Sequence, residues 1–177
     1  GKLELNTKSE VDEVIRNLSG AKYNIEEIKT SSRTKKAPLP FTTSTLQQEA
    51  SKVLGFSTQK TMRLAQQLYE GIEIKGQGTT GIITYLRTDS TRVSEEARAN
   101  AAKFIANEYG EAYVAKTEDV KKDEKRIQDA HEAIRPTDVS RVPESLKDSL
   151  SRDLLRLYQL IWKRFMASQM TSTVFET

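Results

Sequence analysis

Helical spacing of apolar residues, stopped repeatedly by a glycine, is the feature that most restricts how this chain folds. In residues 9–20, apolar side chains recur at helical spacing before Gly20, and Ser9 with Asp12 forms a capping-box pattern. Three later segments repeat the arrangement, each with a final glycine: Gly55, Gly71 and Gly110. The longest amphipathic face follows at Leu154, Tyr158, Ile161, Trp162 and Phe165. The sequence therefore predicts a fold dominated by helices.

Short extended segments are predicted between these helices. Residues 23–30 are rich in Tyr, Ile and Thr, residues 82–86 form a short apolar run, and residues 171–175 are β-like. Pro143 suits the first turn of the last long helix. The predicted fold class is therefore α+β, predominantly α-helical.

A segment of prolines and cations separates the first predicted helix from the rest. Residues 31–40 contain Pro38, Pro40 and three cations. Proline lacks a backbone N–H and restricts its neighbours, so this composition predicts a linker without regular structure. We expect a domain boundary there.

The composition excludes several kinds of site. The chain has no cysteine and one histidine, which rules out disulfides, thiolate zinc sites and histidine-rich metal clusters. A metal ion would need carboxylate ligands, and no Asp-x-Asp run is present. No apolar stretch approaches the roughly 20 residues of a membrane span, and no signal-peptide pattern is present. A cytoplasmic protein is the expectation, and its net charge of +3 permits nucleic-acid binding.

The predicted helices on either side of residues 55–57 resemble a helix-turn-helix. The second of them offers cations and amides that could face DNA: Gln59, Lys60, Arg63, Gln66 and Gln67. A non-enzymatic DNA-binding module is therefore one functional hypothesis. A partner-binding scaffold built on the last amphipathic helix is another, although that apolar face is more simply explained as core.

A cluster of hydrogen-bonding side chains follows the apolar run at residues 82–86. Tyr85 and Arg87 lie two positions apart, which places them on the same side of an extended segment. A phenol with a pKa of about 10 needs a nearby positive charge or a proton acceptor to act as a nucleophile. Arginine offers donors in a fork that matches a phosphodiester. The simpler interpretation makes Tyr85 a strand aromatic and residues 89–91 turn and cap residues.

The second cluster surrounds the single histidine. Residues 129–137 read DAHEAIRPT and include Asp129, His131, Glu132 and Arg135. Two acids, an imidazole and an arginine thus converge over seven positions and are followed by a proline. The simpler interpretation is an exposed Glu132–Arg135 ion pair at i and i+3 on a helical turn.

Three segments resemble motifs of the type IA DNA topoisomerases. Residues 81–90, GIITYLRTDS, are similar to the motif of the active-site tyrosine, and residues 129–137 are similar to the histidine motif, in the same order along the chain. Residues 40–50, PFTTSTLQQEA, resemble the segment upstream of the tyrosine. Leu86 after the tyrosine is typical of the bacterial topoisomerase I branch.

This resemblance implies roles for individual residues. Tyr85 would attack one DNA strand and form a 5′-phosphotyrosine, Arg87 would bind and polarise the phosphate, and His131 would assist at the same phosphate. The family then passes another strand through the gap and reseals it, which relaxes negative supercoils. Further DNA-binding residues implied by the motifs are Thr88, Asp89, Ser90 and Arg135.

The resemblance also implies partners outside this chain. The family binds Mg²⁺ through alternating aspartates in a separate nucleotidyl-transfer domain, so we expect the ligands elsewhere and the isolated chain to be inactive in relaxation. Residues 40–170 are expected to form the helical domain with the catalytic tyrosine. Residues 1–39 would belong to a β-rich arch and linker, and residues 171–177 would form a return strand to that arch. The expected substrate is a single-stranded segment of DNA.

Overall fold

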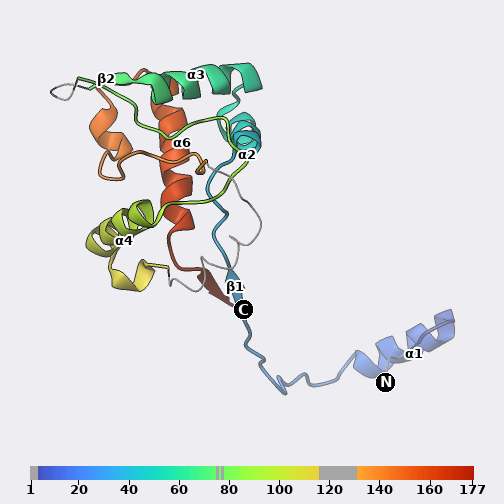
Figure 1. Ribbon diagram of the computed structural model, residues 1–177. Helices are drawn as coiled ribbons and strands as arrows, with labels where there is room; N and C mark the ends of the chain where they lie inside the picture. Colours follow the sequence, from blue (N-terminus) through green and yellow to red (C-terminus); the bar gives the residue numbers. More distant parts are fainter. Residues whose placement is uncertain (1–3, 75, 77, 116–130) are drawn as a thin grey trace. The chain divides into compact units, whose positions relative to one another are not determined.

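The computed structural model describes residues 4–74, 76, 78–115 and 131–177. The chain divides into two compact units, one made of residues 1–33 with 176–177 and one made of residues 34–175. No helix in the described ranges combines the length and the hydropathy of a transmembrane segment. The fold is α+β and dominated by helices, as the sequence predicts (Figure 1).

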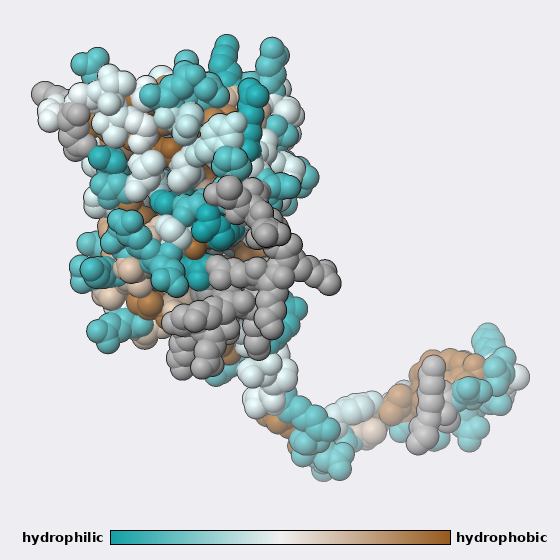
Figure 2. All heavy atoms as spheres, in the orientation of Figure 1, coloured by the Kyte–Doolittle hydropathy of each residue, from teal (hydrophilic) through white to brown (hydrophobic). Residues whose placement is uncertain are grey.

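Helix α1 (Lys8–Leu18) confirms the first predicted helix but begins at a different cap. Thr7 is the N-cap, its hydroxyl accepts from the Glu10 backbone N–H at 3.4 Å, and the Glu10 carboxylate accepts from the Thr7 N–H at 2.9 Å. The predicted Ser9–Asp12 capping box is therefore wrong, because the longer Glu10 side chain reaches back to an earlier threonine. Figure 2 shows hydrophobic residues at the surface of this helix, where Ile15 and Leu18 are exposed.

The extended strand predicted at residues 23–30 is not formed. Residues 21–30 have no regular structure, and Tyr23, Ile25 and Ile28 are exposed. A strand needs a hydrogen-bonded neighbour, and residues 23–30 have none among the described residues. A composition rich in strand-forming residues was therefore not sufficient to produce a strand at residues 23–30.

A small sheet joins the end of the first segment to the C-terminal tail. Strand β1 (Ser32–Lys35) pairs with β4 (Thr173–Glu176), which confirms the β-like tail. Ser31 and Thr177 extend the pairing with reciprocal N–H to C=O bonds of 2.9 Å. The prediction that residues 31–40 lack regular structure is wrong at β1, because a partner strand distant in sequence supplies the hydrogen bonds.

The helices at residues 43–49 and 58–70 each begin after a residue whose hydroxyl accepts a backbone N–H bond. Thr42 caps α2 (Thr43–Glu49), which continues as a π-helical turn, η1 (Ala50–Leu54), and Ser57 caps α3 (Thr58–Glu70). Gly55 joins η1 to α3 with φ at 69°, a left-handed conformation that favours glycine. The other elements are the hairpin β2 (Ile72–Ile74) and β3 (Gly78–Thr80), then α4 (Glu95–Tyr109), the 3-10 turns η2 (Glu111–Tyr113) and η3 (Pro143–Leu146), and α6 (Arg152–Ser168).

Pro143 was predicted to start the last long helix, and this prediction is wrong. Pro143 opens η3, and α6 begins separately after Ser151. A turn at residues 147–149 separates the two elements, so the proline fixes a local turn and not the long helix.

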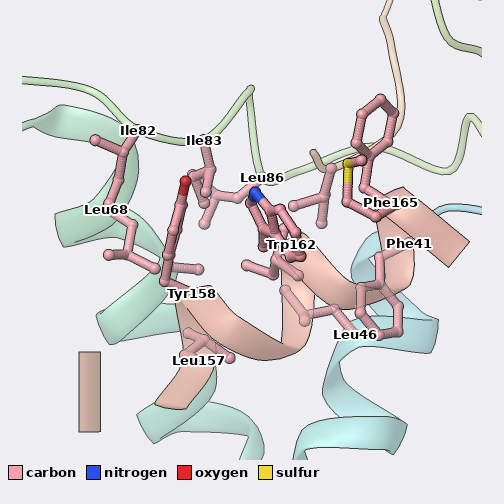
Figure 3. Packing of buried hydrophobic residues seen from close by; sticks show 14 of the residues in the cluster. Phe41, Leu46, Leu68, Ile82, Ile83, Leu86, Leu157, Tyr158, Trp162 and Phe165 are labelled. Atoms are coloured by element: carbon pink, nitrogen blue, oxygen red, sulfur yellow. The ribbon is translucent and has the colours of Figure 1, made fainter. Parts of the chain in front are cut away.

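Helix α6 forms the centre of the core. Its buried side chains Leu157 and Tyr158 lie beside Leu68 of α3, and Phe165 belongs to the same buried cluster (Figure 3). The buried residues they meet from elsewhere in the chain include Phe41, Leu46, Leu68, Ile82, Ile83 and Leu86. The apolar face of α6 is therefore core, which removes the basis for a scaffold role.

Two polar groups of α6 tie the core to residues 139–141. The Tyr158 hydroxyl donates to the Arg141 carbonyl at 2.7 Å, and the Trp162 indole N–H donates to the Val139 carbonyl at 3.0 Å. Both rings are buried, so each polar group needs a protein partner. Burial also raises the pKa of the Tyr158 phenol above its ordinary value.

Residues 82–86 are extended and largely buried, but they do not form the predicted regular strand. Ile83 makes an isolated antiparallel bridge with Pro136, and Thr84 N–H donates to the Arg135 carbonyl at 2.9 Å. The pairing stays short because the Ile82 N–H donates to the Leu68 carbonyl and the Arg135 N–H donates to the Thr84 hydroxyl, instead of to the opposite backbone. This short pairing nevertheless places the segment of Tyr85 beside the segment of His131.

Replacing Tyr158 with Phe should lower the free energy of unfolding by about 1 to 3 kcal/mol, because the part-buried Arg141 carbonyl loses its donor. The raised pKa adds a pH dependence. The unfolded phenol ionises first, so the contribution of Tyr158 is complete below pH of about 10 and is lost as the pH rises further. Urea unfolding at neutral and alkaline pH measures both effects. The exposed Tyr113→Phe is the control, and equal stability of the two variants would contradict the assignment.

Candidate active site

The side chain of Tyr85 lies where the two sequence clusters meet. The Tyr85 residue is 39% exposed. The centroid of the Tyr85 ring lies 5.3 Å from that of His131, with the planes tilted by 39°. On the same ring, Tyr69 packs edge-to-face at 5.5 Å and 68°. The structure thus brings together the predicted site residues Tyr85 and His131, which are far apart in sequence.

Thr84 holds the tyrosine segment against the histidine segment. Its hydroxyl donates to the Ala133 carbonyl at 2.7 Å and accepts from the Arg135 N–H at 2.9 Å. Its own N–H donates to the Arg135 carbonyl at 2.9 Å. These bonds fix the backbone of Ala133 and Arg135, which follow His131, against the residue that precedes Tyr85, so the segments of Tyr85 and His131 are held side by side.

Thr43 does the same for the segment that contains Arg87. Its hydroxyl donates to the Leu86 carbonyl at 2.7 Å and accepts from the Thr88 N–H at 2.9 Å. The Thr43 N–H donates to the Thr88 carbonyl at 2.9 Å. Arg87 is therefore held between two backbone groups that Thr43 binds. Thr43 was not predicted as a site residue, although it lies in the block upstream of the tyrosine that resembles the family motif.

A pocket of about 430 Å³ opens beside His131 and Arg87. Its other lining residues are Thr43, Ser44, Thr88 and Asp89. Arg87 is exposed, and no carboxylate within residues 4–74, 76, 78–115 and 131–177 forms an ion pair with it. A guanidinium with available donors, together with hydroxyl groups and an imidazole, suits an anionic ligand such as a phosphodiester.

The predicted DNA-binding residues at 88–90 have different environments. Thr88 and Ser90 are buried, and their hydroxyls accept backbone N–H bonds from Ser90 at 3.0 Å and from Arg92 at 3.2 Å. These two side chains therefore shape the turn that follows Arg87. Asp89 is exposed and lines the pocket.

Arg135 is engaged by a neighbouring carboxylate. Its Nη2 and Nε lie 2.6 Å and 2.8 Å from the same oxygen of Glu132, and its Nη1 donates to the Pro136 carbonyl at 3.0 Å. The side chains of Arg135 and Glu132 are only 14% and 19% exposed, so this is not the exposed pair considered from the sequence. Burial raises the pKa of Glu132, but hydrogen bonds and charge from Arg135 outweigh it and leave that pKa below its ordinary value. Asp129 lies outside the described residues.

The carboxylates of this site do not fit a magnesium centre. Across the part of the chain that the structure describes, no three acidic or histidine side chains gather closely enough to hold a metal ion. Mg²⁺ prefers an octahedral set of oxygen ligands, including one or two carboxylates. Asp89 lines the pocket as a single carboxylate, next to a cation.

Comparison with known proteins agrees with this arrangement. A family model described as DNA topoisomerase matches residues 1–177. Among solved structures, the chain is similar to full-length topoisomerase I from Thermotoga maritima, with 46% sequence identity and a TM-score of 0.74. That match covers 93% of this chain and 26% of the Thermotoga maritima chain. The chain thus spans about a quarter of the length of the topoisomerase it matches.

The family match extends over the whole chain, and the tyrosine and histidine motifs converge on one pocket within it. We conclude that the chain belongs to the DNA topoisomerase family, in its bacterial type IA branch.

Proposed function

We propose that this chain carries the nucleophile of a type IA DNA topoisomerase, and that Tyr85 cleaves one strand of DNA. The observation that carries the proposal is the contact of the exposed Tyr85 ring with His131, which lines the same pocket as Arg87. A nucleophile, a proton-handling group and a phosphate-binding cation are thus provided by one short stretch of surface.

The proposed reaction is a transesterification. The Tyr85 Oη attacks the phosphorus of a phosphodiester, its proton is lost, and the 3′ oxygen of the preceding nucleotide leaves and gains a proton. The product is a 5′-phosphotyrosine with a free 3′ hydroxyl. Attack of that hydroxyl on the phosphotyrosine reverses each step and reseals the strand, so no external energy source is needed. Passage of another strand before resealing would relax negative supercoils.

Arg87 and His131 have separate roles in this proposal. The Arg87 guanidinium binds the non-bridging phosphate oxygens and stabilises the charge that develops on them. The His131 imidazole, beside the attacking ring, donates a hydrogen bond to the phosphate or carries the proton that is transferred.

The remaining predicted DNA-binding residues would have different roles, depending on how exposed each side chain is. Asp89 would contact the DNA directly, because it is exposed in the pocket. Thr88 and Ser90 would act through the turn that their buried hydroxyls stabilise. Arg135, which Glu132 holds, would support the backbone beside Thr84 and contribute positive charge near the DNA.

The complete enzyme would need parts beyond these residues. We place the Mg²⁺ ligands in a nucleotidyl-transfer domain outside this chain. Residues 40–170 would form the tyrosine domain, and residues 1–39 with 171–177 would belong to a β-rich arch. The substrate would be a single-stranded segment of cytoplasmic DNA.

A helix-turn-helix module without catalysis is the alternative, and one contact weakens it. Lys60, on the face of α3 that would meet DNA, pairs with Asp153 at 2.6 Å and lies 4.2 Å from the centre of the Phe56 ring. This cation therefore holds α3 against the start of α6. Covalent attachment separates the two hypotheses, because only the enzyme joins Tyr85 to DNA.

Tyr85→Phe in the full-length protein should abolish covalent capture of DNA. Phenylalanine keeps the ring but removes the oxygen that joins phosphorus. Labelled single-stranded oligonucleotide, quenched during cleavage and separated on a denaturing gel, shows the adduct as a slow band. Tyr109→Phe, another exposed tyrosine, is the matched control and should retain the band. Wild-type adduct levels in Tyr85→Phe would place the nucleophile elsewhere.

Arg87→Lys and His131→Ala should slow cleavage without abolishing it. Lysine keeps the charge but loses the two-pronged donor fork, which typically costs about 10² to 10³ in rate. Loss of the imidazole should cost about 10² to 10⁴. Single-turnover cleavage rates measure both effects, with Arg152→Lys on α6 as the control. Wild-type rates in Arg87→Lys would exclude Arg87 from phosphate binding.

The 177-residue chain alone should not relax negatively supercoiled plasmid in Mg²⁺, because its described residues offer no carboxylate cage for the ion. Agarose gels of topoisomers are the measurement, with full-length enzyme as the positive control and circular dichroism to check folding. Relaxation by a clean, folded preparation would refute the division of the site between two domains.

A further inference from the structure

Tyr69 is the second aromatic residue in contact with Tyr85, and none of the motifs includes it. It lies near the end of α3 and is 39% exposed, the same fraction as Tyr85. The Tyr69 ring meets the Tyr85 ring edge-to-face, at 5.5 Å between centroids. The Tyr85 ring therefore has an aromatic neighbour in Tyr69 as well as in His131.

The backbone fixes Tyr69 relative to Tyr85. The hairpin of β2 and β3 turns the chain back, so that the segment of Tyr85 passes the end of α3. Ile82 N–H donates to the Leu68 carbonyl at 2.8 Å. A Cβ at Gly81 would lie 2.5 Å from the Tyr69 carbonyl oxygen, so only glycine permits this close approach. The contact between the two rings thus rests on a rigid arrangement of main chain.

An exposed nucleophile needs help to keep one orientation. The side chain of Tyr85 rotates about two bonds, and only some orientations aim its oxygen at a phosphate in line with the leaving group. An edge-to-face aromatic pair favours one orientation of the ring by a factor of about two to twelve. His131 also restricts the orientation of the Tyr85 ring. The proposed role of His131 at the phosphate, however, requires its imidazole to remain free to exchange protons.

We propose that Tyr69 is a positioning residue that holds the Tyr85 ring in the orientation needed for attack on DNA. This inference rests on the proposed function of Tyr85. The contact is between the two rings, so the aromatic ring of Tyr69 is required and its hydroxyl is not. Tyr69 acts through Tyr85 and does not itself touch the reacting atoms.

The test compares Tyr69→Leu and Tyr69→Phe in the full-length protein, with Tyr109→Leu as the matched control. Tyr109, like Tyr69, is an exposed tyrosine near the end of a helix, and a glycine follows that helix. Single-turnover cleavage of a saturating oligonucleotide should be slowed about two- to twelvefold in Tyr69→Leu. Tyr69→Phe and Tyr109→Leu should cleave at the wild-type rate. DNA affinity and the thermal midpoint should be unchanged in all three variants.

Several outcomes would overturn the inference. Tyr69→Leu cleaving as fast as Tyr109→Leu would show that Tyr69 is not needed. Equal slowing in Tyr69→Phe and Tyr69→Leu would assign the effect to the hydroxyl. A loss confined to DNA affinity would make Tyr69 a platform for a nucleobase, and a loss that follows the thermal midpoint would make it a purely structural residue.

Tyr85→Phe, assayed in parallel, separates this inference from the function on which it rests. Absence of the adduct in Tyr85→Phe together with wild-type cleavage by Tyr69→Leu would overturn the role of Tyr69 alone. Persistence of the adduct in Tyr85→Phe would overturn both, because the nucleophile would then be another residue.

Discussion

The set of hydrogen bonds made by Thr84 is the constraint on which the rest of the site depends. One hydroxyl and one N–H bind the backbone of Ala133 and Arg135, and they join two segments about 50 residues apart. Buried Ile82, Ile83 and Ile134 surround the junction with core, so the bonds are shielded from water. Tyr85 and His131 project from these two segments and meet because their backbones are already paired. The hydrogen bonds at this junction therefore determine how Tyr85 and His131 lie relative to each other in the proposed site.

Arg135 and Arg87, the two arginines near this junction, have different roles. Glu132 and the Pro136 carbonyl engage Arg135, whose guanidinium is largely buried and braces the histidine segment. Arg87 is exposed in the pocket, on a turn that Thr43 fixes through backbone bonds. A phosphate would therefore meet the available guanidinium first, while the paired one keeps the backbone in place.

Local features of the fold could be predicted from the sequence, and features that depend on distant partners could not. Helical spacing and the final glycines Gly55, Gly71 and Gly110 were sufficient to predict α2 with η1, α3 and α4. The strand expected at residues 23–30 failed because no neighbour pairs with it within the described residues, and β1 formed where none was expected because the C-terminal tail pairs with it. In the site, the motifs indicated Tyr85, Arg87 and His131. Thr43 and Tyr69 were missed because their importance lies in contacts across 43 and 16 positions of sequence, respectively.

Whether Tyr85 is the nucleophile is decided by identifying the residue that becomes bonded to DNA. The full-length enzyme is trapped on an oligonucleotide, digested with nuclease and trypsin, and examined by mass spectrometry. Cleavage after Lys75 and Arg87 releases residues 76–87, in which Tyr85 is the single tyrosine, whereas Tyr69 falls in residues 64–75. A 5′-linked nucleotide is expected on the peptide of Tyr85. A nucleotide on the peptide of Tyr69 or on any other peptide, or one linked through its 3′ end, would contradict this expectation.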